Sequence, residues 1–200
     1  MNELATLWDW RRRVADLYAE IRRMEDPVAA WRLWCDTRND LFGHHPQSPV
    51  LGQAGFGGIA MFPHDPGLRL AVTLHPAEGD EILLPAGDDE AVRAAPFART
   101  EGLAARLGGE LTLYWLQLYG GGVFLPFTDA TCGVETYGGG RYLLDGVKSA
   151  DLGNLPDGRT VLDFNFAYHP SCAHSDRYVC PLAPRENRLP VAIRAGERLG

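Results

Sequence analysis

Polar residues and glycines concentrate most densely in residues 128–142, which contain two carboxylates, three threonines, two tyrosines and an arginine. The glycines at 138–140 let backbone N–H groups approach a ligand closely, and Arg141 beside them offers a planar fork for a carboxylate or phosphate. The segment matches neither the Walker pattern nor the G-x-G-x-x-G dinucleotide fingerprint. Two interpretations follow: an anion-binding loop, or a glycine-rich hairpin in which Arg141 pairs with Asp129 or Glu135 for structure.

A second group of polar residues lies in the β-like run 160–168. Strand alternation sends the leucine and aromatic residues of this run to one face and both Asp163 and Asn165 to the other. On a solvent-exposed face these side chains need no function, whereas inside a barrel each must find a partner or a ligand. We therefore expect Arg141, Asp163 and Asn165 to share one cavity. The ligand-binding set predicted from both segments is Asp129, Glu135, Tyr137, Gly139, Gly140, Arg141, Asp163 and Asn165.

Cysteine and histidine residues form a third group near the C-terminal end. Structural zinc sites usually take ligands two to four residues apart from two knuckles, whereas seven residues separate Cys172 from Cys180 and no second knuckle is visible. We therefore predict free thiols and no metal site, although Cys172, His174 and Cys180 leave a metal open as an alternative. A nucleophilic pair of Cys132 with His169 or His44 is compatible with the sequence, because such partners need only be close in space, but no motif supports it.

The elements that must position these residues begin with two helices predicted over residues 3–43. Apolar residues recur at steps of three and four between Leu4 and Met24, which is typical of an amphipathic helix. Asp26 followed by Pro27 predicts the start of a second helix, which ends at Gly43. The sequence thus predicts an αα-hairpin at the N-terminal end.

The remainder of the chain is predicted to be a β-rich body over residues 69–168 and a C-terminal segment, 169–200, that wraps it. No helix-length periodic stretch separates the β-like runs, so they are expected to pair as antiparallel strands. The predicted fold class is α+β, a helical hairpin packed on a mainly antiparallel β-barrel or β-sandwich, with residues 1–200 forming a single domain. The predicted strands are 69–75, 81–85, 110–119, 123–127 and 160–168.

Composition excludes several classes of protein. Apolar residues make up 46% of the chain and charged residues 22%, which is typical of a globular domain rather than a disordered one. A formal net charge of -7 argues against a nucleic-acid partner, and no apolar run is long enough to cross a membrane. The N-terminus lacks the features of a secretory signal, so the expected location is the cytoplasm.

Four segments, in this order, resemble the bacterial and archaeal family of unknown function called DUF1684. They are LFGHHPQSP at 41–49, LPF leading to ETYGGGRYL at 125–143, LDFNFAY at 162–168 and CPLAPRENRL at 180–189. The resemblance spans most of the chain and implies one DUF1684 domain. It implies no catalytic residues, because the family has no assigned function. Cys132 stands where a small residue such as Ser or Ala is expected, which makes it a poor choice for an essential nucleophile.

Three functions are compatible with these residues. We predict binding of a small polar or anionic molecule in a β-barrel pocket, where paired carboxylates would permit acid–base catalysis. A flavin mononucleotide carrier of the split-barrel kind is one form of this function. The alternatives are a non-catalytic scaffold or interaction module and a metal-binding protein. The sequence leaves the cofactor, the oligomeric state and the question of enzymatic activity open.

Overall fold

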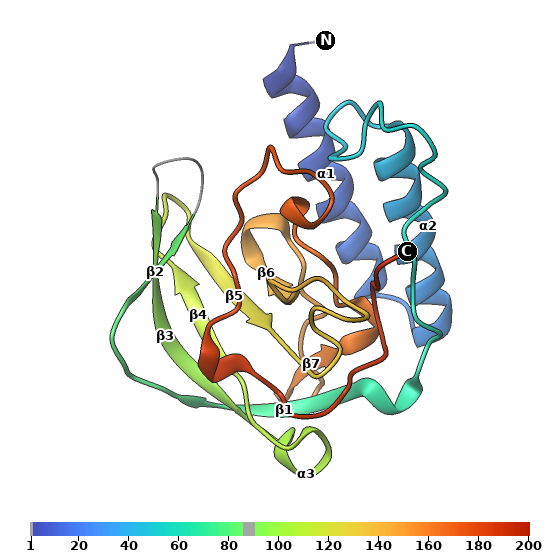
Figure 1. Cartoon of the computed structure of the whole chain (residues 1–200). Helices are drawn as coiled ribbons and strands as arrows, with labels where there is room; N and C mark the ends of the chain where they lie inside the picture. Colours follow the sequence, from blue (N-terminus) through green and yellow to red (C-terminus); the bar gives the residue numbers. More distant parts are fainter. Residues whose placement is uncertain (1, 86–90) are drawn as a thin grey trace.

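The computed structural model describes residues 2–85 and 91–200 of the chain. Helices α1 (Glu3–Ile21) and α2 (Pro27–His44) form the predicted antiparallel hairpin (Figure 1). The Asp26 side chain caps α2 by accepting hydrogen bonds from the backbone N–H groups of Val28, at 2.8 Å, and Ala29, at 3.3 Å. Both helices therefore begin where the sequence predicts.

The body of the molecule is a nearly closed antiparallel barrel of six strands (Figure 1). The strands of the sheet follow the order β6-β5-β4-β3-β1-β7, and the short strand β2 pairs with β3 outside this path. Two backbone hydrogen bonds between Tyr142 and Tyr168 join β6 to the chain just after β7 and nearly complete the circle. The strands are β1 (Arg69–Pro76), β2 (Ile82–Pro85), β3 (Ala91–Glu101), β4 (Thr112–Leu116), β5 (Gly122–Phe127), β6 (Arg141–Asp145) and β7 (Thr160–Asp163).

The α+β prediction is confirmed, and two details of the strand prediction are corrected. Strands β3 and β6 were not predicted, because β3 is rich in alanine and contains Pro96, and β6 follows directly on three glycines. The register of β3 against β4 shifts between Pro96 and Ala98, which is the irregularity expected where a proline removes a ladder donor.

The predicted strand 160–168 is wrong beyond Asp163. The Asp163 carboxylate accepts a hydrogen bond from the backbone N–H of Asn165 at 3.0 Å, which turns the chain into a short 3-10 helix, Phe164–Phe166. Strand alternation therefore stops at Asp163 and does not place Asn165. The two side chains meet through this turn instead, because Asn165 Nδ2 donates to Asp163 Oδ1 at 2.7 Å.

The helical hairpin packs on the barrel wall through aromatic side chains. Trp34 of α2 is fully buried, its ring centroid lies 5.4 Å from that of Phe166, and its Nε1 donates to the Tyr18 hydroxyl at 3.1 Å. A separate apolar cluster that includes Leu125 and Phe164 fills the barrel. The residues just after β7 therefore contact both parts of the molecule: Phe166 packs against the helical hairpin, and Phe164 packs inside the barrel.

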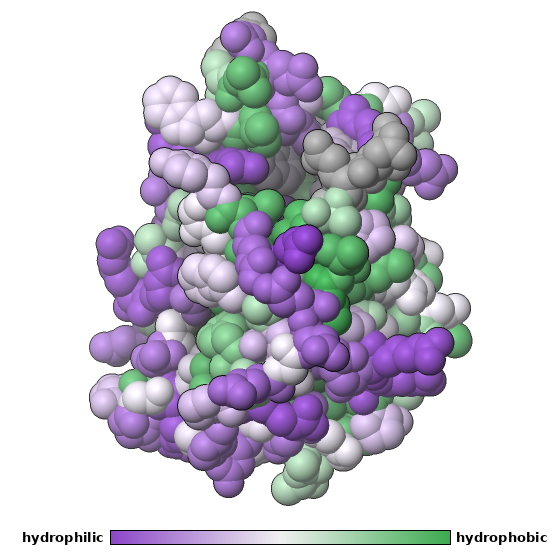
Figure 2. Space-filling model, turned by 90° about the vertical axis from the view of Figure 1, so that its left-hand side faces the viewer, coloured by the Kyte–Doolittle hydropathy of each residue, from purple (hydrophilic) through white to green (hydrophobic). Residues whose placement is uncertain are grey.

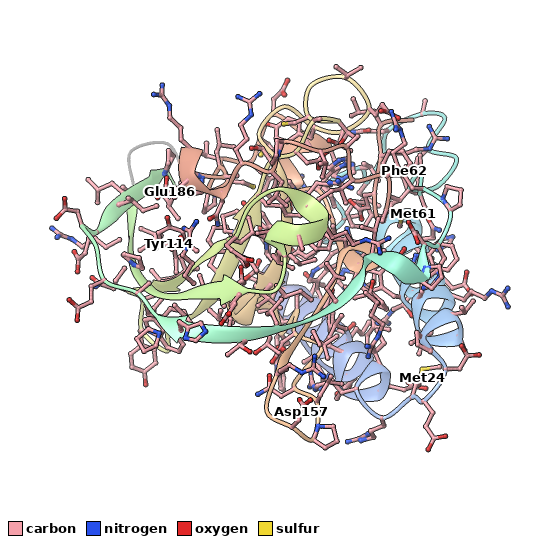
Figure 3. All side chains as sticks on the ribbon, turned by 90° about the horizontal axis from the view of Figure 1, so that it is seen from below. Met24, Met61, Phe62, Tyr114, Asp157 and Glu186 are labelled. Carbon is pink, nitrogen blue, oxygen red and sulfur yellow. The ribbon has the colours of Figure 1, made fainter. Side chains whose placement is uncertain are left out.

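The C-terminal segment crosses the ends of β4 and β5. Asn187 is fully buried, and its side chain makes three hydrogen bonds of 2.8 to 2.9 Å to the backbone. Its Oδ1 accepts from the Thr112 N–H, and its Nδ2 donates to the carbonyl oxygens of Thr112 and Pro126. Next to it, Tyr114 of β4 donates its hydroxyl hydrogen to Glu186, and Figure 3 shows these two residues side by side. Further along, Phe62 N–H donates to Gly196 O at 2.9 Å, so the last residues also pair with the chain that precedes the barrel.

Exposed apolar side chains lie on the outer face of the sheet. Figure 2 shows the side of the molecule that carries β2 and β3, where hydrophobic residues gather among hydrophilic ones. Leu83 of β2, Phe97 of β3 and Trp115 of β4 are exposed, and the rings of the last two are in edge contact. Among the described residues, no helix has the length and hydropathy that a membrane span requires.

Candidate functional site at the floor of a cleft

Three side chains that are far apart in sequence meet beneath the C-terminal residues. His169 comes directly after Tyr168, which pairs with Tyr142 of β6. His174 caps the C-terminal end of a short 3-10 helix, and Glu197 follows a bend of the chain at Gly196. Gly196 has a positive φ of 75°, and a Cβ at that position would strike the carbonyl oxygen of Ala167. Glycine is therefore needed where the chain bends before Glu197. We call His169, His174 and Glu197 the histidine–glutamate site.

Glu197 is fully buried and its carboxylate is held from two sides. Arg38 of α2 donates to Oε1 from Nε at 2.7 Å and also from Nη2, while the backbone N–H of His169 donates to Oε2 at 2.7 Å. The Arg38 guanidinium is itself packed over the rings of Trp34, at 5.1 Å, and Tyr168, at 4.9 Å. A buried carboxylate is tolerated only with such partners, so Glu197 has one fixed orientation.

The two imidazoles face the same carboxylate oxygen without bonding to it. His169 Nδ1 and His174 Nε2 each lie 3.9 Å from Glu197 Oε2, beyond hydrogen-bond length. His174 Nε2 is buried and has no hydrogen-bond partner in the part of the chain that the structure describes. Burial lowers the pKa of His169 to about 4 and also lowers the pKa of His174, so both rings are predominantly neutral at pH 7.

The tautomer of His169 follows from its other nitrogen. The backbone N–H of Tyr137 donates to His169 Nε2 at 3.2 Å, so this nitrogen carries no hydrogen. The hydrogen of the neutral ring must then be on Nδ1, which faces Glu197. The site thus presents a donor from His169 and an acceptor from Glu197 to the same small space.

This tautomer does not fit a metal ion, although the residue types do. Two histidines and a glutamate are a common set of ligands for catalytic zinc, and their ligand atoms lie within 4.8 Å of one another. A ligating nitrogen needs a free lone pair, whereas His169 Nδ1 carries the hydrogen and the Nε2 lone pair is taken by Tyr137. The arrangement suits a hydrogen-bonded oxygen better than a cation.

A cleft of about 270 Å³ lies next to the site, and His169 and His174 contribute to its lining while Glu197 stays buried beneath them. Its floor includes His169 and His174, and its walls combine apolar and polar side chains. The apolar ones are Val50, Phe56, Ile59 and Leu199, and the polar ones are Gln53 and Arg198. Such a mixture of apolar walls and a few directed polar groups is typical of small-molecule sites.

Arg141, the anion anchor predicted from sequence, is almost fully buried. Its Nη2 donates to Asp129 Oδ2 at 2.7 Å and to Ile193 O at 2.8 Å, and its Nη1 donates to Ala195 O and, at 3.2 Å, to Glu197 O. These contacts tie β6 to the C-terminal segment. They match the interpretation of Arg141 as the structural partner of Asp129.

The other residues of segment 128–142 lie around this ion pair. Glu135 is paired at the surface with Arg194 at 2.8 Å. A Cβ at Gly140, where φ is 92°, would lie 2.6 Å from the Phe127 carbonyl oxygen, and one at Gly139 would lie 2.7 Å from Leu182. The two glycines therefore allow close chain packing. Two members of the predicted set contact residues of the histidine–glutamate site: Tyr137 through its backbone N–H to His169, and Arg141 through its bond to the Glu197 backbone oxygen.

Asp163 and Asn165 lie elsewhere on the barrel. Asn165 bonds to Asp65 through both its side-chain atoms at 2.8 Å, while Asp163 Oδ2 has no hydrogen-bond partner among the described residues and faces Arg69 Nε at 3.7 Å. Asp163 lines a cavity of about 60 Å³ with Arg69 and Arg22, and burial raises the pKa of its carboxyl. That these residues and Arg141 bind a ligand in one cavity stays a prediction.

The thiols lie near the site without belonging to it. Cys132 Sγ donates to the backbone oxygens of Tyr137 and Gly138 at 3.2 and 3.1 Å, and burial raises its pKa, which disfavours a nucleophilic thiolate. Cys172 Sγ lies 3.6 Å from the Tyr137 hydroxyl.

Sequence reasoning missed Arg38 and Glu197. In the sequence, Arg38 looks like any other charged residue of an amphipathic helix, because its partner Glu197 is 159 residues away. The one local indication is Gly196 before Glu197, since a glycine often marks a backbone conformation that other residues avoid.

The fold is that of an α+β domain in which a helical hairpin packs on a nearly closed antiparallel barrel. Residues 54–198 match the family described as "Protein of unknown function (DUF1684)", and the chain belongs to that family. It is similar to the solution structure of the uncharacterized protein from gene locus rrnAC0354 of Haloarcula marismortui. The identity is 31%, the TM-score 0.56, and the match covers 88% of this chain and 98% of that one. No curated protein matches the chain.

Proposed function

We propose that this protein binds a small polar or anionic molecule in the cleft above the histidine–glutamate site. The observation that carries the proposal is the unpaired, buried Nε2 of His174 at the floor of a cleft of about 270 Å³. A buried polar atom without a partner costs about 1–3 kcal/mol. A ligand that satisfies this atom recovers that free energy, so the floor of the cleft favours a polar group.

The preference for an anion rests on the charges around the cleft. Glu197 is already paired with Arg38, so the carboxylate beneath the floor is compensated. At the cleft wall, Arg198 donates to Met61 O at 3.4 Å and to Leu199 O at 3.1 Å. A guanidinium has five N–H donors, so these two bonds leave donors for a bound carboxylate or phosphate.

Acid–base catalysis is a second candidate at the same place. A neutral imidazole close to a fixed carboxylate is a common general base, and the pKa of His174 is lowered so that its base form predominates at pH 7. This candidate requires a ligand whose reacting proton reaches His174 Nε2, so binding has to be tested first.

An NMR titration tests the binding proposal. Acetate, succinate and inorganic phosphate, added at millimolar concentrations, are expected to shift the imidazole signals of His169 and His174 and the amide signal of Leu199. The imidazole of His75, exposed on β1, is the internal reference. Arg198→Met should weaken the binding of anions, whereas Arg159→Met, which removes an exposed arginine of another loop, should not. Unchanged cleft signals with all three probes would refute the proposal.

A further inference from the structure

The two histidine nitrogens of the histidine–glutamate site lie at the same distance from the glutamate oxygen. His169 Nδ1 and His174 Nε2 each lie 3.9 Å from Glu197 Oε2, which is too far for a direct hydrogen bond and the right separation for one bridging atom. A single oxygen placed among the three atoms is within hydrogen-bonding reach of all of them. The site is therefore shaped for one oxygen atom.

The hydrogen-bonding capacities of the three atoms select the kind of oxygen. His169 Nδ1 carries a hydrogen and must donate, because its Nε2 accepts from Tyr137. Glu197 Oε2 can only accept. The bridging group must therefore both accept and donate, which a hydroxyl does. An ammonium group has no lone pair for His169, and a carboxylate has no hydrogen for Glu197.

We propose that the ligand of the cleft is a small hydroxy acid whose hydroxyl group occupies the histidine–glutamate site and whose carboxylate lies toward Arg198. This inference rests on the proposed function and narrows it to one chemical class. His174 Nε2 completes the hydroxyl site, and the apolar wall formed by Ile59 and Leu199 accommodates the carbon chain. A water molecule retained at the same position is the competing occupant.

Matched pairs of probes separate these occupants. Glycolate and acetate, lactate and propionate, and malate and succinate have the same charge within each pair and differ by one hydroxyl. In the wild-type protein the hydroxylated member should bind about tenfold more tightly, since a buried site built for a hydroxyl discriminates against a ligand that lacks it. The readout is the dissociation constant from the NMR titration, and the His174 Nε2 signal should move further with the hydroxylated member of each pair than with its partner.

Two variants complete the experiment. His174→Leu replaces the imidazole by an apolar side chain and so removes Nε2. The two members of each pair should then bind equally. His75→Leu changes an exposed histidine outside the cleft and should keep the preference. Equal binding within each pair in the wild type, with the cleft signals shifting, would mean that water occupies the site. That result overturns the hydroxyl assignment and leaves the proposed function standing. No shift with any probe overturns both.

Discussion

At the scale of single residues, burial decides what the ionisable side chains can do. His169 is 3% exposed, and Arg141 and Glu197 are 1% and 0% exposed, so each depends on its immediate partners. For His169 the charged form is disfavoured, because desolvation outweighs the attraction of Glu197. The ring is thus a neutral hydrogen-bonding group over most of the pH range.

The first prediction concerns how His169 makes the stability of the protein depend on pH. Its pKa falls from 6.5 to about 4 on folding, so between these values the unfolded chain binds more protons than the folded one. Stability must then rise with pH across this window, and acidification from pH 6.5 to 4 should remove about 3 kcal/mol. Urea unfolding at several pH values should show a flatter profile for His169→Gln than for the wild type. His75→Gln should keep the wild-type slope, and identical slopes in all three proteins would contradict the assignment.

The second prediction distinguishes the two interpretations of Arg141. Lysine cannot reproduce a guanidinium that bonds to Asp129 and to several backbone carbonyls, so Arg141→Lys should lower the free energy of unfolding by about 3 kcal/mol. Arg194→Lys, at an exposed pair with Glu135, should change it by less than about 1 kcal/mol. An unchanged thermal midpoint together with lost anion binding would favour the ligand role predicted from sequence.

At the scale of elements, the helices were predictable because their signals are local. Asp26 and Pro27 mark the start of α2 within two residues, and the apolar stripe of α1 repeats within each turn. The strands were less predictable, since β3 and β6 are specified by the partners that they find in the sheet. Asp163 shows the limit most clearly, because its side chain ends β7 where alternation alone would continue the strand.

The third prediction tests the strongest of these local signals. Asp26→Ala removes the acceptor of two N–H groups at the start of α2, so the free energy of unfolding should fall by about 1 kcal/mol. Glu25→Ala changes the exposed carboxylate next to it and is the matched control. Chemical denaturation measures both. Equal effects of the two substitutions would show that the loss is one of charge rather than of the cap.

At the scale of the whole molecule, the candidate site exists only because the chain closes on itself. Its histidines come from the chain that follows β7 and its glutamate from the last residues, while Arg38 of α2 holds the glutamate, and no sequence pattern links these segments. Glycines and the conspicuous Arg141 drew attention to segment 128–142, while the deciding contact joins Arg38 to Glu197. Pairings over such distances are set by packing, which a single sequence does not reveal.

This long-range ion pair supports the last prediction. Arg38→Met leaves a buried carboxylate without its cation, and Glu197→Gln leaves Arg38, whose side chain is 13% exposed, without its anion. Each substitution should cost about 3–5 kcal/mol, because the remaining charge stays desolvated and unpaired. The double variant should cost less than the sum, since neither charge then remains. Denaturation of the four proteins gives the coupling directly, and hydrogen exchange in residues 193–198 should rise in the single variants. Additive losses would show that Arg38 and Glu197 do not stabilise each other, and that packing alone holds α2 and the C-terminal segment together.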